Sequence, residues 1–256
     1  MRAVSDRFDR VELRVEAREF VTHTGELNGQ RLTVISTGIG TDNVDIVLNE
    51  LDALFNIDLE RRTVRDRLTR LDFLRFGTSG AFQPDLPLDS FLLSAAALAT
   101  DGLLPFYLSA GEPDSLAIDL FEHLEDGKVQ LPVPVLIVRP DFPSAVASSD
   151  LPRGVTMTAA GFYAPQGRSL RLSSGLSSAL LDRLRNWRSD DLRLTNIEME
   201  TAGIYGLATA LGHRSASISA LLANRAEGTF SRQPAATVSK LIDRGLELAV
   251  QTAATR

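Results

Sequence analysis

The stretch Leu71-Asp72-Phe73-Leu74-Arg75-Phe76-Gly77-Thr78-Ser79-Gly80 begins as an apolar run and ends in two glycines. The run predicts a buried strand that ends at Phe76, and the glycines predict a turn with free backbone N–H groups. Ligands of open α/β sheets bind beyond the carboxyl ends of strands, so Arg75 is expected at such a position. Its guanidinium is a permanently charged, planar fork that fits a phosphate group. A surface arginine beside an ordinary turn remains the alternative.

Strands and helices alternate on both sides of this stretch. Apolar runs predict further strands at Arg31–Ser36, Phe91–Ala99, Val133–Arg139, Val155–Ala160 and Ser215–Ala223. Helical periodicity predicts helices at Asn43–Leu54, Glu60–Arg70, Asp114–Glu125, Leu176–Trp187, Thr201–Leu211 and Ala235–Thr252. This alternation favours an α/β sandwich around a mostly parallel or mixed sheet. Similar patterning continues on both sides of the loop Pro140–Pro152, so we expect one domain over residues 1–256.

The composition excludes several classes of protein. The 256 residues carry a net charge of -6, which argues against a general nucleic-acid surface. No apolar run approaches the roughly 18 residues that span a bilayer, and the charged N-terminus is unlike a secretory signal. The three histidines are scattered without metal-ligand spacing, so no metal site is expected. The absence of cysteine excludes disulfides and fits a cytoplasmic protein.

The segment Asn196-Ile197-Glu198-Met199-Glu200-Thr201-Ala202-Gly203 places two carboxylates where an irregular segment turns into a helix. Acidic groups at a helix N-terminus are favoured by the helix dipole, so capping explains the pair without any ligand. The functional alternative is that Glu200 and its neighbours bind a sugar. The other ligand-binding motifs of the chain favour that alternative.

Phe162-Tyr163-Ala164-Pro165-Gln166-Gly167-Arg168 combines an aromatic ring, an amide and a guanidinium. Gln166 can donate and accept hydrogen bonds, whereas Arg168 only donates. The pair suits a planar heterocycle with carbonyls and an N–H, such as uracil, on which Phe162 could stack. An ordinary Gly-Pro loop is the alternative.

Gly38-Ile39-Gly40-Thr41-Asp42-Asn43 follows a strand and opens a helix, the position of a dinucleotide fingerprint. The third glycine is replaced by Asn43, and no acidic strand end follows, so NAD binding is disfavoured. A tight turn near some other ligand fits the segment better.

Six motifs, taken in order, resemble those of the nucleoside phosphorylase family, and within it the pyrimidine branch. They are Arg18-Glu-Phe20, Ser36-Thr-Gly38-Ile-Gly40, Arg75-Phe-Gly-Thr78, Phe162-Tyr-Ala-Pro-Gln166-Gly-Arg168, Glu198-Met199-Glu200 and Asn224-Arg225. The resemblance covers nearly the whole chain and implies a single-domain, three-layer α/β sandwich with a central mixed sheet. Purine-branch relatives carry aspartate in place of Arg225 and lack the Gln-x-Arg pair.

The resemblance implies a role for each motif in reversible phosphorolysis of uridine. Glu200 would accept hydrogen bonds from the ribose hydroxyls, with Met199 packed on the sugar and Glu198 buttressing the site. Gln166 and Arg168 would bind uracil, and Phe162 and Arg225 would complete the base-binding set. No cofactor is implied, because inorganic phosphate is the co-substrate.

At the phosphate end, the resemblance implies that Arg75 and Thr78 hold phosphate and the edge of the ribose. Arg18 would reach a neighbouring subunit's site, so the minimal active unit would be a homodimer, and a hexamer is open. Relatives have a first strand, a Gly-Asp-Pro-x-x-Arg phosphate loop and an N-terminal histidine, whose expected place precedes Met1. We interpret this as a start assigned too far downstream, or a truncation that impairs activity. A purine phosphorylase, a nucleosidase of the same fold and a non-catalytic nucleoside-binding protein remain alternatives.

Overall fold

A computed structural model describes residues 1–108, 113–134 and 136–255. Its centre is an eight-stranded mixed sheet in the order β13-β12-β6-β11-β9-β7-β8, with β10 paired to β11 and a further pairing of β12 with β7. The strands are β6 (Asp72–Ala81), β7 (Phe91–Thr100), β8 (Leu136–Val138), β9 (Arg153–Ala159), β10 (Arg188–Ser189), β11 (Leu192–Glu198), β12 (Arg214–Asn224) and β13 (Thr229–Phe230). The predicted α/β class and mixed sheet are therefore confirmed.

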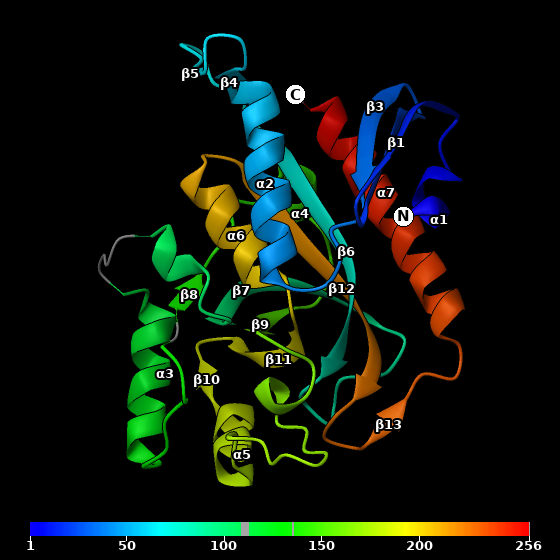
Figure 1. The fold of residues 1–256 in the computed structure, drawn as a ribbon. Helices are drawn as coiled ribbons and strands as arrows, with labels where there is room; N and C mark the ends of the chain where they lie inside the picture. Colours follow the sequence, from blue (N-terminus) through cyan, green and yellow to red (C-terminus); the bar gives the residue numbers. More distant parts are fainter. Residues whose placement is uncertain (109–112, 135, 256) are drawn as a thin grey trace.

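Helices cover both faces of this sheet and complete the three layers (Figure 1). On one face, α2 (Thr41–Asn56) and α6 (Thr201–Ala210) share an apolar cluster that includes Val44 and the fully buried Tyr205. On the other face, α7 (Pro234–Ala254) packs Leu241 and Leu248 against Ile218 of β12. A third cluster joins α3 (Ser115–Asp126) and α5 (Ser178–Asn186) to the same sheet. The short elements are α1 (Arg2–Ser5), α4 (Ser144–Ala147), η1 (Leu104–Phe106) and η2 (Ala164–Gln166).

The strand that contains Arg75 does not end at Phe76. β6 continues through both glycines to Ala81, and β12 pairs with it in parallel from Arg214↔Asp72 to Asn224↔Ala81. The predicted glycine turn with free N–H groups is therefore wrong, and Arg75 lies inside a central strand. The backbone hydrogen bonds of β12 hold the glycine segment extended, which local turn preference cannot reveal.

Residues 57–70 also differ from the prediction. Instead of a helix over Glu60–Arg70, they contain a hairpin of β4 (Ile57–Asp58) and β5 (Thr63–Val64). The Asp58 side chain accepts hydrogen bonds from the N–H groups of Glu60 and Arg61, and Arg62 takes a left-handed φ of 57°. These local contacts form a tight turn that interrupts the helical periodicity.

A separate antiparallel sheet precedes α2 and contains β1 (Arg10–Ala17), β2 (Phe20–Leu27) and β3 (Gln30–Ile35). Of these three strands, only β3 was predicted. In the central sheet, β11 was not predicted either. The other predicted strands and helices are present with shifted ends, although position 135, inside the predicted Val133–Arg139 strand, lies outside the described residues. Within the described chain, no helix has the length and apolar character that crossing a bilayer requires.

Candidate active site

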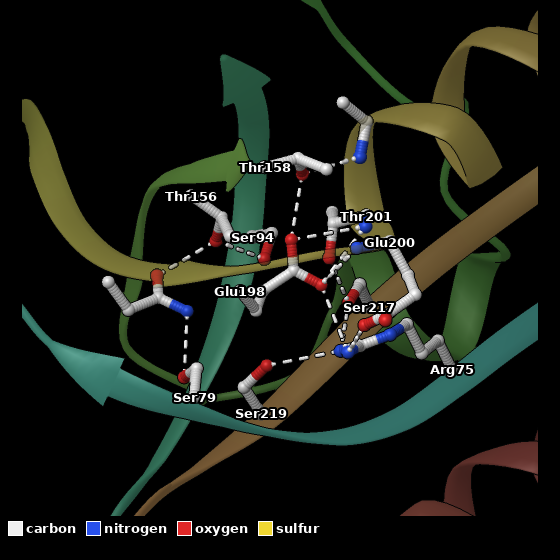
Figure 2. Close-up of polar contacts among 12 residues, drawn as sticks. Arg75, Ser79, Ser94, Thr156, Thr158, Glu198, Glu200, Thr201, Ser217 and Ser219 are labelled. Carbon is white, nitrogen blue, oxygen red and sulfur yellow. Dashed lines mark hydrogen bonds and ion pairs between the residues drawn. The ribbon is translucent and has the colours of Figure 1, made fainter. Parts of the chain in front are cut away.

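Arg75 lies at the centre of a buried ionic cluster (Figure 2). Its Nη2 is 2.6 Å from Oε2 of Glu200 and 3.0 Å from Oε2 of Glu198. Its Nη1 donates to the hydroxyls of Ser217 and Ser219 on β12, at 3.3 and 3.4 Å. The guanidinium therefore joins β12 to the end of β11, two strands that lie on either side of β6 in the sheet.

Gly77 makes this position of Arg75 possible. A Cβ atom at Gly77 would lie 2.0 Å from Nη1 and 2.4 Å from Cζ of Arg75, because the guanidinium folds back over its own strand. Gly77 was predicted to form a turn. Instead, its missing side chain leaves space for the guanidinium of Arg75.

The capping interpretation holds for Glu198 and not for Glu200, whose side chain makes no capping hydrogen bond to α6. The Glu198 carboxylate accepts hydrogen bonds from the N–H groups of Glu200 and Thr201 at the start of α6, at 3.0 to 3.2 Å. The Thr158 hydroxyl donates to its Oε1 at 2.7 Å and accepts from the N–H of Ala202. With a side chain only 2% exposed, Glu198 is a fixed part of the fold that also holds Arg75.

Glu200 is held by two donors from different elements. Arg75 donates to its Oε2, and the backbone N–H of Gly40, which precedes α2, donates to its Oε1 at 2.7 Å. Gly40 has a φ of 98°, a conformation that favours glycine. The turn at Gly38–Gly40, which was expected to lie near a ligand, therefore contacts Glu200 of the acidic motif. The sequence alone did not indicate this contact.

The charges of this cluster do not balance. Burial alone would lower the pKa of Arg75, but the carboxylates of Glu198 and Glu200 more than offset burial and the pKa is raised. Arg75 is therefore a permanent cation between two acids. By formal count, two carboxylates and one guanidinium give the cluster one excess negative charge, and the N–H groups at the start of α6 and before α2 stabilise it by donating hydrogen bonds.

A second cluster is centred on Gln166, which is 3% exposed at the end of η2. Its Oε1 accepts from Nη1 of Arg168 at 2.6 Å and from Nη1 of Arg225 at 3.1 Å. Arg225 Nη2 also donates to the backbone carbonyl of Gln166. In the described part of the chain, neither guanidinium contacts a carboxylate. Since guanidiniums only donate, the amide oxygen must face them.

Burial lowers the pKa of Arg168, and it lowers that of Arg225 to about 10 with added repulsion from Arg168 and Arg185. The stem of Arg225 crosses Gly80 of β6, where a Cβ would lie 3.1 Å from its Cδ. Gly77 and Gly80, which are three residues apart on β6, thus leave space for Arg75 and Arg225 respectively. That spacing corresponds to roughly 10 Å along β6.

Phe162 is 52% exposed and contacts Arg168 on one face of its ring. The Arg168 Cζ lies 4.0 Å from the ring centroid, and Arg168 Nη1 donates to the Phe162 carbonyl at 2.5 Å. The Phe162 ring therefore contacts the Arg168 guanidinium, and it also meets the ring of Tyr163 edge to face, with centroids 5.3 Å apart. Stacking of Phe162 on a base stays a prediction.

Three predicted site residues have no contact that joins them to either cluster in the described chain. Thr78 is exposed on β6, and in a regular strand its side chain leaves the face opposite to that of Arg75. Met199 is half-buried between the two acids. Arg18 is exposed in the turn between β1 and β2 with a φ of 53°. Their phosphate and ribose roles stay predictions.

Several contributing residues carried no sequence signal. Ser217, Ser219 and Thr158 lie in strands and reach the acids or Arg75 only through strand pairing and the sheet-to-helix turn. No group of three or more histidine or carboxylate side chains within the described ranges has the arrangement of a metal site.

The chain belongs to the phosphorylase superfamily, whose family model matches residues 1–253. It is 29% identical to a uridine phosphorylase of Thermococcus kodakarensis over 84% of this chain and 66% of that protein. It is 27% identical to a uridine phosphorylase of Haemophilus influenzae over 98% of this chain and 86% of that protein. A Trypanosoma brucei nucleoside phosphorylase, described as showing uridine phosphorylase activity, has a similar fold, with a TM-score of 0.83 at 23% identity, over 98% of this chain and 90% of that one.

Proposed function

We propose that the protein catalyses the reversible phosphorolysis of uridine to uracil and ribose 1-phosphate. The observation that carries this proposal is the pair of guanidiniums, Arg168 and Arg225, that meet at one buried amide without a carboxylate partner. Such an arrangement favours negative charge on a bound heterocycle. Membership of the phosphorylase superfamily and the names of the relatives support the same reaction.

Glu200 is the proposed ribose acceptor. Ionised carboxylates accept hydrogen bonds only, so two adjacent sugar hydroxyls can donate to its oxygens. Its contacts with Arg75 and the Gly40 N–H fix the carboxylate before substrate arrives, which reduces the entropy lost on binding. Met199, beside it in sequence and half-buried, supplies an apolar surface for the sugar ring.

Phosphate needs more positive charge than Arg75 provides. Arg75 is already paired with Glu198 and Glu200, so a phosphate dianion beside it meets a cluster with excess negative charge. Arg18 of a neighbouring subunit is the proposed additional cation, because it is exposed on a hairpin turn and contacts neither cluster among the described residues of its own chain. The active unit would then be a homodimer or a larger homo-oligomer, and we retain a cytoplasmic location as a prediction.

In the proposed step, a phosphate oxygen attacks C1′ of the ribose from the side opposite the base. The C1′–N1 bond breaks, and its electron pair leaves with uracil, which departs as an anion. The anion then takes up, through solvent, the proton that the newly formed hydrogen phosphate ester releases. Donors from Gln166, Arg168 and Arg225 stabilise that anion, and phosphate stabilises the oxocarbenium-like sugar. A donor placed at developing charge contributes on the order of a few kcal/mol. No general base is required, because phosphate is already ionised.

The test measures turnover of uridine, thymidine and inosine with and without phosphate. We expect uridine cleavage that depends strictly on phosphate and yields ribose 1-phosphate. Cleavage without phosphate would assign the protein as a nucleosidase, and preference for inosine would overturn the base assignment. Binding of uridine without any cleavage would contradict the enzymatic function.

A further inference from the structure

We infer that Tyr205 of α6 is a positioning residue for Arg75, because its hydroxyl separates two strands of the central sheet and thereby sets the place of Ser217. The inference rests on the proposed function, in which Arg75 contacts phosphate and orients the ribose acceptor. Tyr205 belongs to neither of the two polar clusters, and no sequence motif pointed to it.

Tyr205 lies at the point where β12 stops pairing with β7. The antiparallel register of these strands ends at Ile218↔Leu93, and its continuation by one residue would place Ser217 opposite Ser94. Instead, the Tyr205 hydroxyl lies between these two serines. It donates to the Ser94 carbonyl at 2.7 Å and accepts from the Ser217 N–H at 2.9 Å. One phenol thus replaces a hydrogen bond of the ladder and keeps the strands apart.

The side chain of Ser217 connects this point to the ionic cluster (Figure 2). Its hydroxyl accepts from Arg75 Nη1 at 3.3 Å and shares a hydrogen bond of 2.8 Å with the Thr201 hydroxyl at the start of α6. Because the N–H and the hydroxyl of Ser217 belong to one residue, a shift of β12 at this position moves both. Tyr205 therefore fixes one of the two β12 hydroxyls that accept from Arg75.

Burial keeps Tyr205 in the protonation state that this role requires. The residue is 0% exposed, and burial, helped by the Glu198 carboxylate, raises the pKa of the phenol. A neutral phenol donates and accepts at once, whereas a phenolate has no proton to donate to the Ser94 carbonyl. The hydroxyl can therefore bridge the two strands at every pH at which the protein would be assayed.

The alternative is that Tyr205 only satisfies two buried backbone groups and stabilises the fold. Loss of its hydroxyl lowers stability in either case, because a buried donor and a buried acceptor lose their partner. The two roles differ in what happens to Arg75. If Tyr205 is a positioning residue, its loss lets Ser217 approach Ser94 and withdraws the Ser217 hydroxyl from the guanidinium.

Kinetics of Tyr205→Phe, which keeps the ring and removes the hydroxyl, separate these roles. We expect the KM for phosphate to rise about tenfold while kcat stays within about threefold, since a binding group is displaced. Leu120→Val is the stability control, because Leu120 of α3 is 1% exposed and lies in a different apolar cluster from Tyr205. A lower melting temperature without any change in the KM of Tyr205→Phe would overturn the inference.

A double-mutant cycle with Ser217→Ala tests whether Tyr205 acts through Ser217. Ser217→Ala alone should reproduce the loss of kcat/KM for phosphate that Tyr205→Phe causes, within about threefold. Adding Tyr205→Phe to Ser217→Ala should then change kcat/KM by less than about twofold. Losses that multiply would show that the two residues act independently, and the inference would fail.

A crystal structure of the Tyr205→Phe variant provides a readout independent of turnover. We expect the Ser217 N–H to approach the Ser94 carbonyl, and the Ser217 hydroxyl to leave hydrogen-bond distance of Arg75 Nη1. An unmoved Ser217 would contradict the positioning role. If the native protein fails to cleave uridine, the proposed function fails, whereas the position of Ser217 can still be compared between the two structures.

Discussion

The cluster around Arg75, the proposed sugar end of the site, and the cluster around Gln166, the proposed base end, arrange charge in opposite ways. At the sugar end, one guanidinium lies between two carboxylates that are 2% and 11% exposed. At the base end, two guanidiniums meet at an amide, and neither has a carboxylate partner in the described chain. The first cluster is held together by ion pairs between buried groups. The second places two positive charges side by side, and in the proposed reaction these charges would stabilise a departing anionic base.

The largest expected effect is at the sugar end. Arg75→Leu would leave two buried carboxylates without a cation and should destabilise the protein by about 3–5 kcal/mol. We expect turnover of uridine to fall below detection, since Glu200, the proposed ribose acceptor, also loses a partner that orients it. Urea unfolding and kcat/KM measure the two effects.

Arg75→Lys serves as the control, because it retains one positive charge but cannot bridge both acids and both serines. Its stability should lie between those of the native protein and Arg75→Leu. Equal stability of all three proteins would mean that the ion pairs do not support the fold.

The two glycines of β6 allow the clusters to be compared by one added methyl group each. At Gly77, a Cβ would overlap Arg75, which cannot move without losing Glu198 and Glu200. At Gly80, the Cβ would lie 3.1 Å from Arg225 Cδ, and a shift of a few tenths of an ångström relieves the contact. Gly77→Ala should lower kcat/KM about 100-fold and stability by about 2 kcal/mol. Gly80→Ala should change kcat/KM only a few-fold. The reverse order would show that the base end is the more rigid region.

The smallest expected effect is on stability at the base end. Burial and like charges lower the pKa of Arg225 to about 10, so its charged form is less favourable in the folded than in the unfolded protein. Arg225 is protonated at pH 7 in both states, so this penalty is fully present there and decreases only as the pH rises through 10. Arg225→Met should therefore leave stability unchanged or raise it by about 1 kcal/mol, allowing for partial exposure, while kcat/KM falls about tenfold.

Thermal unfolding at pH 7 measures this effect, with Arg168→Met for comparison. A loss of more than about 1 kcal/mol in Arg225→Met would show that Arg225 contributes to folding as Arg75 does. The two clusters would then contribute to the stability of the fold more equally than their contacts indicate.

The sequence was sufficient for the α/β class and for most of the elements that surround the site, because their apolar periodicity reflects burial against a common core. It failed where tertiary contacts override local preference. β1 alternates charged and apolar residues but is exposed on nearly all of its positions, so burial left no clear pattern. The glycines at 77 and 80 have the composition of a turn, and only the arginines that cross them explain their presence.

For the site, residue types were predictable and their partners were not. Glu198 and Glu200 look equivalent in sequence, yet one caps α6 and the other is tied to Gly40 across 160 residues of chain. Arg168 and Gln166 are close in sequence, and their contact could be anticipated. The approach of Arg225 to the same amide depends on where β12 ends, which only the assembled sheet determines.

The double engagement of Glu198 has a consequence for redesign of the enzyme. Its carboxylate both caps the N-terminus of α6 and binds Arg75, so any replacement would alter folding and chemistry together. Two positions later, Glu200 makes no hydrogen bond that caps the helix through its side chain. Libraries that seek altered sugar selectivity should therefore vary residue 200 and keep residue 198 constant. The two acids of this motif therefore differ in how much of the fold depends on them.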